Sequence, residues 1–188
     1  MSLLEEIMKA QQPVRRKVFI SYYHKDDQKY RDALEKHFGH LFISKSVQPG
    51  DINTDVSSDY IKALIQQDYL SDSSVLLVLV GPKTLCRKHV DWEMSAALST
   101  KVGGNSGVAA ILLPELQLLP DGRFNYDTVP ARFADNSKSG YALAYNWSFA
   151  TASEANMRSI IETAFKARVS KKHLINNGRL QMGKNTCE

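Results

Sequence analysis

Apolar and polar positions along this chain alternate between the patterns of buried strands and of helices. Val75–Val80 is the clearest case, because six apolar residues without a polar break are typical of a strand buried on both faces of a parallel sheet. Gly81-Pro82 ends this strand, and residues 85–98 then repeat apolar side chains at helical spacing. Glu93 falls at the edge of that helix's inward stripe, just past the carboxyl end of a strand, where open α/β sheets place their sites.

The same alternation continues through the rest of the chain. A strand over 18–20 leads into a helix that Asp26 or Asp27 is expected to cap and Gly39 to end. The remaining signals predict strands at 41–43, 108–113 and 141–147, a helix from about 57, and a helix over 153–168 capped by Ser153 or Thr151. We therefore predict an α/β, flavodoxin-like, doubly wound fold, with a mostly parallel five-stranded sheet and helices on both faces.

The segment between the fourth and fifth strands is long. Residues 114–140 are interrupted by Pro and Gly and show no strong periodicity of apolar side chains. We therefore expect a loop that covers or extends a functional face, or else a poorly ordered stretch.

Length and charge indicate one near-neutral domain with a basic end. The chain has 188 residues, 43% of them hydrophobic, and a net charge of +4. Residues 166–188 hold six basic residues and one acidic residue, so the rest of the chain sums to about zero. We expect an extension at 1–14, a domain over 15–168, and a tail at 169–188 that is solvated and poorly ordered, and no binding of nucleic acid.

Targeting and redox signals indicate the cytoplasm. The first residues carry acidic side chains and no cleavage pattern of a secretory signal, and no apolar run reaches the length that spans a membrane. Cys86 and Cys187 are the only cysteines and lie far apart in the sequence. This argues against a disulfide framework and for a reducing compartment.

The sequence lacks the residues and spacings that several kinds of catalytic or binding site require. The Gly-rich run at 103–107 precedes a strand and lacks the Lys-Ser/Thr pair of a phosphate-binding loop. The His and Cys residues have no metal-ligand spacing, and no Gly-x-Ser-x-Gly elbow is present. We therefore expect neither a metal nor a serine nucleophile.

A combination of motifs resembles a known family. Arg16-Lys-Val-Phe-Ile-Ser-Tyr22, the Pro49-Gly50 loop, and Leu76-Leu-Val-Leu-Val-Gly-Pro82 leading to Asp91-Trp-Glu93 are similar to the Toll/interleukin-1 receptor (TIR) domain. More narrowly, the chain resembles the TIR-like signalling subunit of the bacterial Thoeris antiphage defence system, over roughly residues 15–165. It departs from the TIR pattern where Ser46 replaces an acid in the loop and His89 replaces a Trp before the Glu.

The resemblance implies an enzyme that uses NAD as its substrate and needs no cofactor. Enzymatic TIR domains cleave the bond between nicotinamide and ribose and then hydrolyse the product or cyclise it. The Thoeris subunit is expected to make a cyclic ADP-ribose isomer that diffuses to a partner NAD-consuming effector. Glu93 matches the catalytic Glu, and one carboxylate suits the oxocarbenium-like ribose that remains when nicotinamide leaves. Activation by a phage-derived trigger is expected to proceed through assembly into a homo-oligomer.

Candidate substrate contacts follow from the same resemblance. Flat side chains that can contact the two bases are Tyr22, Tyr23, His24, His89 and Trp92. Lys45 or Lys25 is expected to meet the diphosphate, and Ser21 and Asp51 complete the predicted substrate-binding set.

Several of these residues are equally compatible with a purely structural role. A Glu on a helix is commonly a solvated surface residue, Trp92 serves equally well as packing, and Pro49-Gly50 is compatible with a simple turn. Tyr22 and Tyr23 alternate across a strand, which predicts that one is buried and the other exposed.

Two other functions remain open at this point. One is a non-catalytic scaffold that pairs with other TIR-like domains through its Pro49 loop and helices. The other is a nucleoside-processing enzyme that uses a similar carboxylate on a related sheet.

Overall fold

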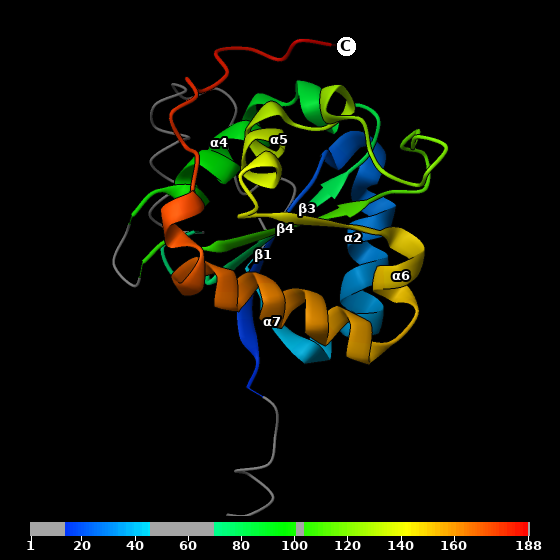
Figure 1. Ribbon diagram of the computed structural model, residues 1–188. Coiled ribbons are helices and arrows are strands. Elements are labelled where there is room, and N and C mark those ends of the chain that lie inside the picture. The colour runs from blue at the N-terminus through cyan, green and yellow to red at the C-terminus, as the bar shows by residue number, and fades with distance from the viewer. Residues whose placement is uncertain (1–13, 46–69, 101–103, 188) are drawn as a thin grey trace, which may run out of the picture.

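The computed structural model describes residues 14–45, 70–100 and 104–187, and its centre is a parallel sheet (Figure 1). Five strands lie in the order β2-β1-β3-β4-β5, and every neighbouring pair is parallel. This 2-1-3-4-5 order is the flavodoxin-like arrangement, so the predicted fold class is confirmed. The strands are β1 (Arg16–Ser21), β2 (Phe42–Ser44), β3 (Val75–Val80), β4 (Gly107–Leu112) and β5 (Leu143–Asn146).

The inner strands are buried because helices cover both faces of the sheet. Every residue of β3 and of β4 is buried, as the unbroken apolar run predicts. Alternate residues of β3 pack to opposite sides, with Leu76 and Val78 in one apolar cluster and Val75 and Leu77 in the other.

The helices divide between the two faces as a doubly wound fold requires (Figure 1). α4 (Lys88–Leu98) and α5 (Ala131–Lys138) pack on one face, and α2 (His24–Phe38) and α7 (Glu154–Ser170) pack on the other. The short α6 (Trp147–Thr151) follows β5. Single 3-10 turns complete the described elements: η1 (Gly39–Leu41), η3 (Thr84–Cys86), η4 (Tyr126–Thr128) and η5 (Lys172–Leu174).

Some details of the helices differ from the prediction. Ser153 caps α7, as expected, by accepting a hydrogen bond from the Asn156 backbone. The expected cap of α2 was wrong, because that helix begins at His24 and neither Asp26 nor Asp27 caps it. Asp27 is instead turned inward and buried. The helix predicted from about residue 57 lies outside the described residues.

The long segment after β4 is more regular than predicted. Residues 114–140 were expected to be a loop, but they contain η4 and the helix α5. The helix was missed because it is short and begins directly after Pro130, and its apolar residues fill little more than one turn. Its buried side chains Phe133 and Ala134 join the core beneath α4.

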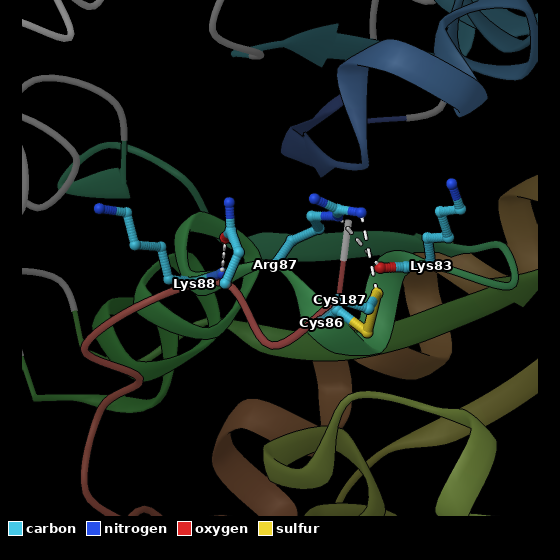
Figure 2. Close-up of a disulfide and its surroundings, with 6 residues drawn as sticks. Lys83, Cys86, Arg87, Lys88 and Cys187 are labelled. Atoms are coloured by element: carbon cyan, nitrogen blue, oxygen red, sulfur yellow. Dashed lines mark hydrogen bonds between the residues drawn. A yellow bond between two sulfur atoms is a disulfide. The ribbon is translucent and has the colours of Figure 1, made fainter.

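The basic tail was predicted to be solvated and poorly ordered. Residues 176–187, which we call the strap, are mostly exposed, as predicted. The expected poor order was wrong, because hydrogen bonds tie the strap to α4 and α5. The strap lies along the outer side of α4 and α5 (Figure 1). The prediction against a disulfide was also wrong, because Cys86 and Cys187 are bonded with their Cα atoms 5.4 Å apart (Figure 2). A sequence separation of 101 residues hides this proximity until the chain folds back. The predicted boundary of the tail at residue 169 falls inside α7.

Two further observations concern the described residues as a whole. Their helices include none that is both long and apolar enough to cross a bilayer. They also contain no group of three or more His, Cys, Asp or Glu side chains arranged to hold a metal ion.

Candidate functional site

Glu93 occupies the position that the sheet topology favours for a site. Its side chain extends from α4 to the carboxyl end of β1, where Ser21 Oγ donates a hydrogen bond of 2.5 Å to Glu93 Oε2. The strand order reverses between β1 and β3, and ligands of open α/β sheets bind at the carboxyl ends of the strands beside such a switch point. Glu93 is 7% exposed, so its carboxyl group does not face bulk solvent.

Burial changes the ionisation of this carboxyl group. It raises the pKa of Glu93 from 4.5 to about 8, against a smaller opposing effect of the Ser21 hydrogen bond. At neutral pH the resting protein therefore holds Glu93 protonated. A buried acid with a perturbed pKa at a sheet switch point is the profile of a functional group.

Three of the predicted base contacts lie near one another at the carboxyl end of β1. The Tyr22 ring stacks on the His24 ring with centroids 4.3 Å apart. The negative charge of ionised Glu93 is among the effects that raise the pKa of Tyr22, although burial is the main one. Burial lowers the pKa of both His24 and His89, and charged His24 further lowers that of His89. The structure therefore brings Ser21, Tyr22, His24, His89 and Glu93 to one edge of the sheet.

The other flat side chains have structural partners. Trp92 is 1% exposed and donates from Nε1 to the Met182 carbonyl oxygen, so it belongs to the core and does not offer a face to a ligand. Tyr22 is buried and Tyr23 is partly exposed, as the strand alternation predicts. The Arg87 guanidinium covers the Tyr23 ring at 3.8 Å from its centroid.

The predicted diphosphate contacts do not join this group. Lys45 Nζ pairs with Asp72 at 3.2 Å, just before the amino end of β3. Its backbone N–H bonds to the Val18 carbonyl oxygen, three residues or about 10 Å along β1 from Ser21. Lys25 is exposed on the first turn of α2. Asp51 lies outside the described residues.

A buried network that the sequence did not reveal supports the turn leading into α4. Asp27 is 4% exposed and accepts a hydrogen bond of 3.1 Å from Thr84 Oγ1, which itself accepts one of 2.8 Å from the Gly81 backbone N–H. Burial raises the pKa of Asp27 to about 6. A Cβ at Gly81 would lie 2.6 Å from Asp27 Oδ1, so a larger residue there would displace the Asp27 carboxyl group. In the sequence Asp27 has the pattern of a helix cap, which conceals this role.

A separate cavity lies farther along the same edge of the sheet. Its volume is about 640 Å³, and it is found where β4 and β5 end. Aromatic side chains form much of its wall: Phe124, Tyr126, Tyr145 and Phe149. Glu93 is not among its lining residues, so this cavity and the carboxyl group are distinct features.

The chain is similar to one known protein family. The family model described as "Thoeris protein ThsB, TIR-like domain" matches residues 19–117, which is more than half of the chain and includes Ser21 and Glu93. Among solved structures, the TIR domains of the activated Roq1 resistosome directly recognizing the pathogen effector XopQ align with a TM-score of 0.38 and 10% identity. That alignment covers 86% of this chain and 84% of that one. No curated protein matches the sequence.

Proposed function

The chain belongs to the TIR-like domain family of the Thoeris protein ThsB, and from this membership and the Glu93 site we propose that it is a NAD-cleaving enzyme of bacterial antiviral defence. The reaction breaks the bond between nicotinamide and ribose. The observation that carries the proposal is the buried Glu93 carboxyl group, bonded to Ser21 at the switch point of the sheet.

The ionisation of Glu93 suits this reaction. The nicotinamide ring of NAD is cationic, and a cation placed beside a buried carboxyl group lowers its pKa. Binding of NAD would therefore release the proton that Glu93 holds at rest. The resulting carboxylate then faces the positive charge that develops on the ribose as nicotinamide leaves, and this interaction is strongest in the transition state.

The fate of the ribose depends on what reaches its anomeric carbon first. Folding the adenosine end back over the site converts cyclisation into an intramolecular step, which can contribute as much as ~7 to 11 kcal/mol. His24 and His89 offer flat faces near the carboxyl end of β1 that would support such a folded substrate, and the buried Tyr22 ring stacks on His24. We propose that the main product is a cyclic ADP-ribose isomer.

The biological role follows from the family. The cyclic product acts as a diffusible signal in the cytoplasm and activates a partner NAD-consuming effector. A phage-derived trigger drives assembly of several copies of this chain, and NAD is the substrate with no separate cofactor. Measuring assembly size before and after triggering tests this step, because activity that rises without any change in size contradicts it.

A direct assay tests the reaction itself. Purified protein is incubated with NAD, alone and with extract of phage-infected cells, and nicotinamide and nucleotide products are measured by mass spectrometry. We expect nicotinamide and a cyclic product from the natural sequence and neither from Glu93→Gln. Glu154→Gln is the matched control, because Glu154 is an exposed carboxylate that pairs with His40 far from the site.

The same assay separates the enzyme from a scaffold. If no nicotinamide is released under either condition and Glu93→Gln leaves defence in cells intact, the chain is not an enzyme of this kind. It then acts through pairing with other TIR-like domains.

A further inference from the structure

The strap, residues 176–187, is bonded to α4 at several points along its length. Asn177 Nδ2 donates to the Ser95 carbonyl oxygen at 3.0 Å, and the Met182 carbonyl oxygen accepts from Trp92 Nε1 at 2.8 Å. Only one side of α4 can face the sheet, yet all nine residues from Val90 to Leu98 are buried. The strap therefore helps to enclose the helix that carries Glu93.

A buried ion pair joins the strap to the core. Arg132 is fully buried and donates from Nε to Asp91 Oδ1 at 2.9 Å. Its Nη2 also donates to the Arg179 carbonyl oxygen at 2.9 Å, and Asp91 Oδ2 accepts from the Met182 backbone N–H at 2.8 Å. The charges of Arg132 and Asp91 are thus fully satisfied only while the strap is in place.

The end of the strap caps the first turn of α4. Asn185 Oδ1 accepts a hydrogen bond of 3.0 Å from the backbone N–H of Lys88, the first residue of the helix. The Thr186 backbone N–H donates to the Cys86 carbonyl oxygen at 3.1 Å, and the disulfide from Cys86 to Cys187 closes the strap at this point (Figure 2). The helix has no side-chain cap from its own N-cap residue, so the strap supplies what the local sequence lacks.

Arg87 connects the disulfide to the candidate site. Its Nη2 bonds to Cys187 Sγ over 3.8 Å, a contact drawn as a dashed line in Figure 2. Its guanidinium covers the ring of Tyr23 at 3.8 Å from the ring centroid. Tyr23 follows the end of β1, two residues after Ser21. Arg87, the N-cap residue of α4, thus contacts both the disulfide and the residue that follows β1 by two positions, near Ser21.

We propose that the disulfide and the strap form a redox-controlled clamp, which in its oxidised state holds the first turn of α4 and thereby positions Glu93 against Ser21. The expected effect of the clamp on NAD cleavage rests on the proposed function, whereas its effect on the first turn of α4 does not. The proposed function places the chain in the cytoplasm, and disulfides in such reducing compartments are characteristically transient and regulatory, which fits a clamp that opens and closes.

The opening step is a thiol–disulfide exchange with a dithiol reductant. One reductant thiolate attacks Sγ of Cys187, the less buried of the two cysteines, and forms a mixed disulfide while Cys86 leaves as a thiolate and takes up a proton. The second reductant thiolate then displaces Cys187, which also takes up a proton. The protein gains two electrons and two protons, and the dithiol becomes a disulfide.

The test compares oxidised and reduced protein. The natural protein is equilibrated in glutathione buffers of increasing reducing strength, and free thiols are counted by alkylation and mass spectrometry. Hydrogen exchange of the Lys88–Trp92 amides and NAD cleavage are followed in the same samples. On reduction we expect exchange of these amides to become faster by about tenfold or more. We expect NAD cleavage to fall by about tenfold, because small displacements of a catalytic group are costly.

Two variants make the result specific. Cys187→Ser should resemble the reduced protein in every buffer and lose its response to the reductant. Gln181→Ser, a change at an exposed strap position that keeps the disulfide, should respond as the natural protein does. Reoxidation of the reduced natural protein should restore both slow exchange and activity, which separates clamp opening from irreversible unfolding.

Two outcomes overturn the proposal. One is that the two thiols stay free even in oxidised glutathione, and the other is that the disulfide is reduced without any change in exchange over Lys88–Trp92. If exchange responds to reduction, but no NAD is cleaved in either redox state even with extract of phage-infected cells and Glu93→Gln leaves defence in cells intact, the clamp stands and only the proposed function is refuted.

Discussion

The ionisation of Glu93 makes the stability of this protein depend on pH in a direction opposite to that of an ion-paired carboxylate. Its pKa rises from 4.5 in an unstructured chain to about 8 in the fold. Between these two pH values the native state keeps the Glu93 proton and the unfolded state releases it. The free energy of unfolding therefore falls as the pH rises through this window.

The size of the effect follows from the same shift. At 1.36 kcal/mol per pKa unit, the full difference amounts to about 5 kcal/mol, which is an upper value because water entry and relaxation soften it. Glu93→Gln removes the titration and keeps a polar side chain of the same shape beside Ser21. We expect the stability of the natural protein, relative to this variant, to decline by several kcal/mol between pH 5 and pH 8.

Urea unfolding followed by circular dichroism at pH 5, 6, 7 and 8 measures this difference. Other titrating groups, including Asp27 with its pKa raised to about 6, are present in both proteins and cancel in the comparison. Glu154→Gln serves as the control, because its exposed carboxylate should leave the pH dependence unchanged. A stability difference that stays within about 0.5 kcal/mol over the whole range would refute the reasoning, since that is the scale of an ordinary surface substitution.

Three further predictions concern the same framework. Ser21→Ala removes the hydrogen bond that lowers the pKa of Glu93, so the pH at which kcat/KM rises should move upward. If the midpoint of the pH profile of kcat/KM stays the same, the contact between Ser21 and Glu93 does not set the pKa of Glu93. Gly107→Ala places a Cβ 1.8 Å from the backbone of α7, and we expect no folded protein by circular dichroism, whereas Gly39→Ala, which meets no atom within 4 Å, should fold. Arg132→Met leaves the buried Asp91 without its ion-pair partner and should lower the free energy of unfolding, measured by urea titration, by about 3 to 5 kcal/mol. A loss below about 1 kcal/mol would contradict this prediction.

Much of the architecture was accessible from local patterns. The unbroken apolar run of β3 and the turn signal after it are enough to predict an inner parallel strand, because a strand covered on both sides has no polar face. The same reasoning located β1, β4 and the helix with Glu93, and hence the edge of the sheet at which the site lies. The short helix α5 escaped because so few turns carry little periodic signal.

The candidate site was only partly predictable for a different reason. Glu93 and Ser21 were both named from the sequence, but their contact joins residues 72 positions apart, and nothing local encodes it. Trp92 and Lys45 were named with them and have other partners, because residue type shows what a side chain can do and not which neighbour it meets. Asp27 was predicted to be a helix cap because Asp is common at helix starts, but its side chain bonds to the distant Thr84.

The amino-acid sequence by itself determined the alternation of strands and helices and the kinds of chemistry available, since both depend on spacing along the chain. Only the tertiary structure decided the protonation of Glu93, the burial of Arg132 and the disulfide between Cys86 and Cys187. Each of these depends on which distant segments exclude water from a group or reach bonding distance of it, and that is settled when the chain folds back on itself.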